Sequence, residues 1–98
     1  MEIKALRDGM KNIEVEGMVV EVGESRTVNL RNGGSAEVMD VTIMDKAGGK
    51  VKVPLWDSQI EVGKKKGTKL KIGNGYTGTF RGELQLNIGR YGKLDVVT

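Results

Sequence analysis

The sequence contains no histidine and no cysteine. Histidine is the commonest general base and metal ligand near neutral pH, and cysteine supplies thiolate ligands and disulfides. Asp40 and Asp45 do not compensate, because nothing nearby completes a set of metal ligands. We therefore expect no catalytic role, no metal and no cofactor.

Long apolar runs are also missing. No stretch approaches the roughly 18 apolar residues that a membrane-spanning helix needs. Residues 1–17 do not combine a basic start with an apolar block, so we expect no signal peptide. A chain of 98 residues fits one domain, which we expect to occupy residues 1–98 and to be monomeric.

Aromatic residues are few and unevenly placed. All four, Trp56, Tyr76, Phe80 and Tyr91, lie in the second half of the chain. Residues 1–49 carry six Lys and Arg against nine Asp and Glu, whereas residues 50–98 carry ten against four. Basic and aromatic residues gathered together suggest a surface for nucleic acid. The alternative is a solvated basic face with the aromatic residues in the core.

Alternation of apolar and polar residues dominates the first half and predicts strands. Residues 13–16 alternate, and after Gly17 the apolar set becomes Met18, Val20 and Val22, which predicts a bulge or bend at the glycine. Residues 24–35 are expected to form a polar loop. A second strand over residues 36–45 ends in a hairpin turn.

The run KVKVPLW at residues 50–56 is the clearest predicted strand. Alternation places its aliphatic residues on one face and Lys50, Lys52, Pro54 and Trp56 on the other. Trp56 is therefore expected to stand beside lysines, away from the aliphatic row. Pro54 cannot donate to a ladder, which favours an edge or a bulge here.

Residues 57–62 predict one or two helical turns that start with Asp57 as the N-cap. Further alternation at residues 68–72 and 84–88 predicts two more strands, and Leu94 and Val96 close the chain. Five strands with a helix between the third and fourth are typical of a five-stranded Greek-key barrel of the OB type, an all-β fold. An SH3-like barrel is the rival interpretation.

Residues 73–78, GNGYTG, match a dinucleotide-binding fingerprint in letters only. That fingerprint needs a helix after the glycines, whereas the following residues alternate with the period of a strand. A glycine bulge would instead reset the alternation, so that Tyr76 turns outward rather than into the core.

The run from Val51 to Gly89 resembles the single OB-fold domains of archaeal single-stranded DNA-binding proteins, which are related to replication protein A. The features that carry the resemblance are LW at residues 55–56, NGY at residues 74–76 and FRGELQLN at residues 80–87. It implies a cytoplasmic, nucleoid-associated archaeal protein that acts in replication, recombination and repair. It also implies that Trp56, Tyr76 and Phe80 stack on bases.

Polar residues near these rings are candidates for the remaining contacts. Stacking rings and cations that follow the backbone are how single strands are bound without sequence readout. The predicted polar and phosphate contacts are Lys50, Lys52, Lys69, Lys71, Arg81, Gln85, Asn87, Arg26 and Arg31. Tyr91 is interpreted as a turn residue that packs on the barrel.

Three other functions remain open at this stage. An RNA-binding OB domain uses the same surface chemistry. A subunit of the replication protein A kind would use its barrel face to hold a protein partner of replication or repair. A small-ligand barrel enzyme is disfavoured because histidine and cysteine are absent.

Overall fold

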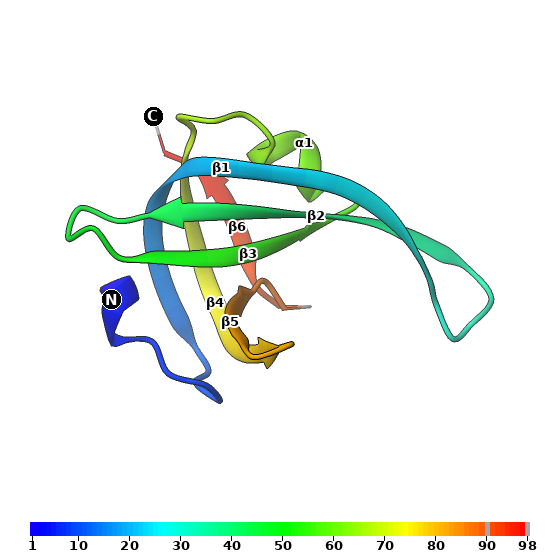
Figure 1. The fold of residues 1–98 in the computed structure, drawn as a ribbon, viewed down its shortest axis with the longest axis horizontal. Helices are drawn as coiled ribbons and strands as arrows, with labels where there is room; N and C mark the ends of the chain where they lie inside the picture. The colour runs from blue at the N-terminus through cyan, green and yellow to red at the C-terminus, as the bar shows by residue number, and fades with distance from the viewer. Residues whose placement is uncertain (90, 98) are drawn as a thin grey trace.

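The computed structural model describes residues 1–89 and 91–97. Long strands dominate, as the alternation predicts, and one short helix follows the third strand (Figure 1). No helix in the described residues is long and apolar enough to cross a membrane. The elements are η1 (Ile3–Ala5), β1 (Ile13–Asn29), β2 (Ser35–Met44), β3 (Lys50–Trp56), α1 (Gln59–Gly63), β4 (Lys69–Phe80), β5 (Glu83–Asn87) and β6 (Lys93–Val96).

The strands close into a ring in the order β1-β2-β3-β5-β4, because β1 pairs with β2 along one part of its length and with β4 along another. Strands β3 and β5 run parallel and meet at Lys52 and Gln85, and all other pairs in the ring are antiparallel. Strand β6 adds to β4 outside the ring. The predicted five-stranded barrel with a helix between its third and fourth strands is therefore confirmed.

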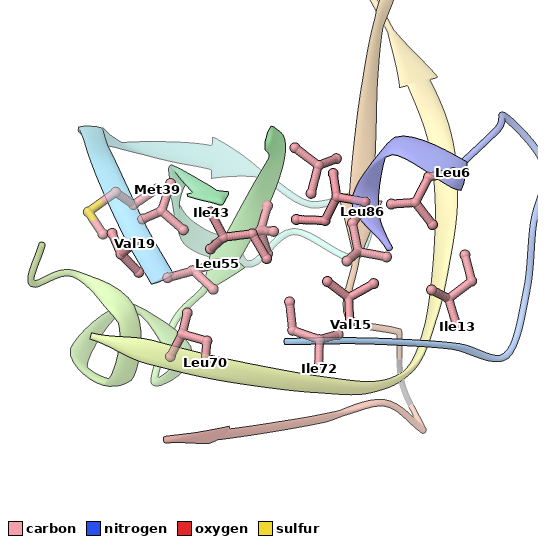
Figure 2. Close-up of a cluster of buried hydrophobic side chains, with 14 of the residues drawn as sticks. Leu6, Ile13, Val15, Val19, Met39, Ile43, Leu55, Leu70, Ile72 and Leu86 are labelled. Atoms are coloured by element: carbon pink, nitrogen blue, oxygen red, sulfur yellow. The ribbon is translucent and has the colours of Figure 1, made fainter. Parts of the chain in front are cut away.

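Aliphatic side chains from the inner faces of the strands fill the ring (Figure 2). Val15 of β1 and Ile72 of β4 are directly paired, and both point into this core. Ile60 of α1 belongs to the same cluster, so the helix covers one end of the barrel. Burial of each such side chain stabilises the fold by roughly 1.5–3 kcal/mol relative to exposure.

The bend in β1 lies three residues later than the sequence suggests. Gly17 continues the buried row of Ile13 and Val15, and Met18 is 39% exposed. The pairing with β2 shifts between Val19 and Glu21 instead. The prediction of a phase change at Gly17 was wrong. A buried glycine has no side chain to mark its face, so the alternation appeared to stop there.

Most of the predicted polar loop at residues 24–35 is strand. Residues 25–29 of β1 pair with residues 35–39 of β2, which forms a two-stranded arm that projects beyond the ring (Figure 1). Arg26 lies on this arm, and Arg31 lies in its tip. The side chains of β1 in the arm are mostly exposed. Without a buried face, no apolar alternation marks the strand in the sequence.

The N-terminal segment is fastened to the barrel at the β2–β3 turn. The carboxylate of Asp45 accepts hydrogen bonds from the backbone N–H groups of Ile3, Ala47 and Gly49, at 2.7, 3.1 and 3.0 Å. The bond from Ile3 is the main cause that lowers the pKa of Asp45, because N–H donors favour the ionised carboxylate. Asp45 thus has a structural role at this turn, which the sequence did not predict.

Candidate nucleic-acid interface

Trp56, the last residue of β3, is 40% exposed, which confirms its predicted outward orientation. It pairs directly with Val38 of β2, and Val38 pairs in turn with Arg26 of β1. Directly paired residues share one face of a sheet. Val38 is only 1% exposed, whereas Trp56 on the same face keeps part of its surface free.

The backbone around Trp56 is held by Gln59, Asp57 and Glu37, none of which was predicted to have this role. The side-chain oxygen of Gln59 accepts a hydrogen bond from the Trp56 N–H at 3.0 Å. The Asp57 carboxylate accepts one from the Glu37 N–H at 3.0 Å, and the Asp57 N–H donates to the Glu37 carbonyl at 2.8 Å.

Asp57 is therefore not the N-cap of α1. Ser58 occupies the N-cap position, and Asp57 adopts a positive φ of 50° at the corner between β3 and the helix. The same short polar side chain that favours an N-cap also tolerates this conformation and bonds to nearby backbone. Its spacing from the helix could not distinguish the two roles.

Tyr76 is turned outward by a bulge one residue earlier than Gly75. Ile13 of β1 pairs with Gly75 of β4, and Val15 pairs with Ile72. One residue lies between the two paired residues on β1, but two lie between them on β4. Asn74 lies in the extra stretch with a positive φ of 53°. The alternation is thereby reset, and Tyr76 is 45% exposed. The predicted phase reset is confirmed, although asparagine rather than glycine takes the left-handed conformation.

Thr77 anchors the strand directly after Tyr76. It is 5% exposed, and its hydroxyl accepts a hydrogen bond from the Met10 N–H at 2.8 Å while donating to the Arg7 carbonyl. Its own N–H donates to the Met10 carbonyl at 2.9 Å. These bonds satisfy a buried polar side chain and join the N-terminal segment to β4 beside the tyrosine.

Phe80 ends β4 and is 52% exposed. A two-residue turn follows, in which Arg81 and Gly82 both have positive φ, as in the type I′ turns that suit hairpins. This turn places the Arg81 guanidinium over the Phe80 ring, 5.2 Å from its centroid. The two residues therefore form one exposed cation–π unit at the tip of the β4–β5 hairpin.

The sheet register brings half of the predicted residues onto one outer surface, which we call the aromatic face. On β4 and β5, Tyr76 pairs with Asn87, and Gly78 pairs with Gln85. Gln85 in turn meets Lys52 of β3. The aromatic face is formed by Lys52, Trp56, Tyr76, Gly78, Phe80, Gln85 and Asn87.

Gly78 leaves an open space between two of the rings. It lies midway between Tyr76 and Phe80 on the same side of β4. A Cβ atom added there would meet only the side-chain nitrogen of Asn87, at an ordinary 3.5 Å. A flat group can therefore approach the backbone between the two rings.

Cations border the aromatic face, and two of them have acidic partners. Lys52 lies 3.2 Å from Glu83, and Arg26 lies 3.4 Å from Asp40. Both pairs are partly exposed, so they contribute little to stability and exchange readily for other anions. Lys50, Arg31 and Arg81 make no ion pair with the described residues.

Lys69 and Lys71 lie outside the aromatic face. They belong to the first half of β4, which pairs with β1 and β6 rather than with β5. Lys71 also lies 3.6 Å from Glu14 of β1. Alternation in the sequence predicts that these lysines point outward. It does not predict which side of the closed barrel they lie on.

Tyr91 does not pack on the barrel as expected, because it is 78% exposed. Its backbone is held instead, since the side-chain nitrogen of Asn74 donates to the Tyr91 carbonyl at 3.3 Å. The sequence placed this tyrosine correctly in a turn but gave no sign that its ring is free.

The arrangement defines a class of protein, namely an OB-fold domain with an exposed aromatic and basic surface. Solved structures support the fold. A replication factor A related protein from Methanobacterium thermoautotrophicum aligns with a TM-score of 0.78 and 22% identity over 99% of this chain and 89% of its own. An OB domain from Thermoplasma acidophilum aligns with a TM-score of 0.82 and 15% identity, over 99% and 85%.

A curated relative narrows the class further. The single-stranded DNA-binding protein Ssb of Saccharolobus solfataricus is 32% identical over 89 residues, which is 91% of this chain. The chain spans 58% of that relative's length. No protein-family model matches the chain. The chain is thus an OB-fold domain with sequence similarity to one archaeal single-stranded DNA-binding protein, in line with the resemblance that its motifs carry.

Proposed function

We propose that residues 1–98 form a single nucleic-acid-binding domain that binds single-stranded DNA with little sequence preference and has no catalytic role. The observation that carries the proposal is the aromatic face, on which Trp56, Tyr76 and Phe80 are each at least 40% exposed. Large exposed rings grouped on one surface mark an interaction site. The similarity to a single-stranded DNA-binding protein supports DNA as the ligand.

Base stacking supplies most of the affinity in this proposal. Each ring presents a π-face to one base, and stacking is worth roughly 1–3 kcal/mol per base by alanine substitution. Because every base has such a face, the interaction tolerates any sequence. Three rings supply about 3–9 kcal/mol gross, from which the cost of ordering the strand is subtracted.

Polar residues hold the backbone and sugars. Lys52 on the aromatic face, together with Lys50 and Arg81 beside it, contacts phosphates. Arg26 and Arg31 extend this track along the projecting arm. Gln85 and Asn87 lie between the rings of β4 and the lysines of β3, where amide groups contact bases or sugars. Neutralising about four phosphates gives a slope of log K against log salt near −3.

Such a domain protects and presents exposed strands during replication, recombination and repair, and its place is the nucleoid in the cytoplasm. We assign Lys69 and Lys71 to a secondary role, in which they meet a strand only if it continues around the barrel.

One titration tests the proposal. Trp56 is the only tryptophan, so its emission reports one site on the aromatic face. Oligothymidine, the matching oligouridine and duplex DNA are added at two salt concentrations. We expect strong quenching by oligothymidine that weakens at higher salt. An equal response to oligouridine would make the domain a general single-strand binder or an RNA binder, and no response to any of the three would favour a protein partner.

A further inference from the structure

A hollow of about 260 Å³ lies beside the aromatic face and is not used by the proposed stacking on Trp56, Tyr76 and Phe80. Tyr76 forms one wall, and Tyr91 and Lys11 also line it. Tyr76 therefore belongs both to the aromatic face and to this hollow. Pockets that take drug-sized ligands measure about 300–1,000 Å³, so this space suits a smaller flat group.

Backbone contacts shape the hollow around the two tyrosines. The Tyr91 carbonyl accepts a hydrogen bond from the Asn74 side chain at 3.3 Å, and the Gly92 N–H donates to the Gly89 carbonyl at 2.9 Å. A Cβ atom on Gly89 would lie 3.0 Å from Cε1 of Tyr76. The Tyr76 ring therefore lies close to the backbone of Gly89.

The chemistry of the hollow fits a nucleotide. Tyr91 is 78% exposed and presents a ring for stacking. Lys11 is exposed at the edge of the hollow and has no ion-pair partner among the described residues. Ring and cation together reproduce the combination found on the aromatic face. Continuity through Tyr76 then favours the next residue of the same strand over a separate small ligand.

We propose that this hollow is an additional nucleotide subsite, in which Tyr91 stacks on the base beyond the one carried by Tyr76 and Lys11 contacts its phosphate. The proposal rests on the proposed function, because it extends the same track by one step. It makes the affinity depend on strand length, since only strands that reach past Tyr76 gain the extra contact.

The test compares Tyr91→Ala with wild type and with Tyr91→Phe, which keeps the ring. Binding is followed by Trp56 emission with oligothymidines that lengthen one nucleotide at a time. We expect the alanine variant to match wild type for the shortest strands that bind. It should bind longer strands about 5- to 150-fold more weakly, the range that stacking of one base gives. Tyr91→Phe should follow wild type throughout.

Two further readouts make the test specific. A 2-aminopurine base is placed at each position of the strand in turn, and its fluorescence is measured with each variant. In Tyr91→Ala, and not in wild type, the quenching of this base on binding should be lost at one terminal position. Lys11→Ala should lower the salt slope by about 0.7 for long strands alone.

Equal affinity of Tyr91→Ala and wild type at every length overturns the subsite and leaves the aromatic face intact. Equal weakening at every length also overturns it, because Tyr91 would then belong to the primary site. If wild type binds no oligothymidine, the proposed function itself fails.

Discussion

The two halves of β4 differ in what they bury and what they expose. In the first half, Leu70 and Ile72 are fully buried, and the lysines between and beside them face solvent. In the second half, Thr77 is buried, whereas Tyr76 and Phe80 point outward. The outer side chains of the strand therefore change from lysines beside a buried aliphatic row to exposed aromatic rings within its own length.

A single extra residue accounts for the change. Alternation places side chains two apart on one face, so one inserted residue moves everything after it to the other face. Without the bulge at Asn74, Tyr76 would continue the row of Leu70 and Ile72 into the barrel. The bulge thus separates residues that stabilise the fold from residues that are free to bind.

The largest expected effect comes from the first half. Ile72→Ala should lower the free energy of unfolding by about 2–5 kcal/mol, because it removes a fully buried side chain and leaves a cavity. Circular dichroism during urea denaturation measures the loss. The affinity of the protein that remains folded for oligothymidine should stay the same. A loss of affinity without a loss of stability would place Ile72 in the binding surface.

Substitution in the second half should have the reverse effect. Phe80→Ala should weaken binding by roughly 1–3 kcal/mol while the denaturation midpoint stays unchanged, because the ring is exposed. Anisotropy of a labelled oligothymidine measures the affinity, with Phe80→Tyr as the control that keeps a stacking ring. Trp56→Ala should behave in the same way. Unfolding of either alanine variant would show that its ring belongs to the core.

The two glycines that flank Tyr76 offer a sharper comparison. Gly78→Val should fill the open space between the rings and weaken binding by about 1 kcal/mol or more, the loss of one stacked base. Stability should not fall, because β-branched residues suit strands. Gly75→Val is the matched control, since its Cβ would lie 3.0 Å from the Asn87 carbonyl oxygen and should destabilise the fold instead. Equal effects of the two substitutions would contradict the proposed gap.

The smallest expected effect concerns charge. Glu83→Gln removes a carboxylate that lies 3.2 Å from Lys52 at the edge of the aromatic face. The freed lysine should strengthen binding by about 0.2–1 kcal/mol, the worth of an exposed ion pair. The salt slope should steepen by at most about 0.7. Weaker binding would indicate that Glu83 itself contacts the strand, for example through a base N–H.

Local patterning predicted the parts of the fold that have one buried face. The strand at residues 50–56 was confirmed, and so was its inner face in the burial of Val51, Val53 and Leu55, although Pro54, which was expected on the other face, is buried as well. Prediction failed where a strand has no buried face, as in the arm around Arg26, and where a glycine interrupts the visible row, as at Gly17. Asp57 was misplaced because its side chain suits both a cap and a corner.

The candidate site shows the same division. The outward orientation of Trp56 was predicted because it alternates in phase with Lys50 and Lys52. That of Tyr76 was predicted from an assumed bulge. The sequence could not predict which lysines lie beside the rings. Lys52, Lys69 and Lys71 all point outward by the same alternation. Their separation depends on which strands pair, and the exposure of the Tyr91 ring had no signal in the sequence.

The sequence by itself determined a small all-β barrel, the residue types of a stacking surface, and the absence of histidine and cysteine chemistry. These follow from composition and from a two-residue period that each strand carries locally. Only the tertiary structure decided that Trp56, Tyr76 and Phe80 share a face and that a hollow opens between Tyr76 and Tyr91. The physical reason is that pairing between distant strands, closed through β1 and β4, sets which outward side chains become neighbours.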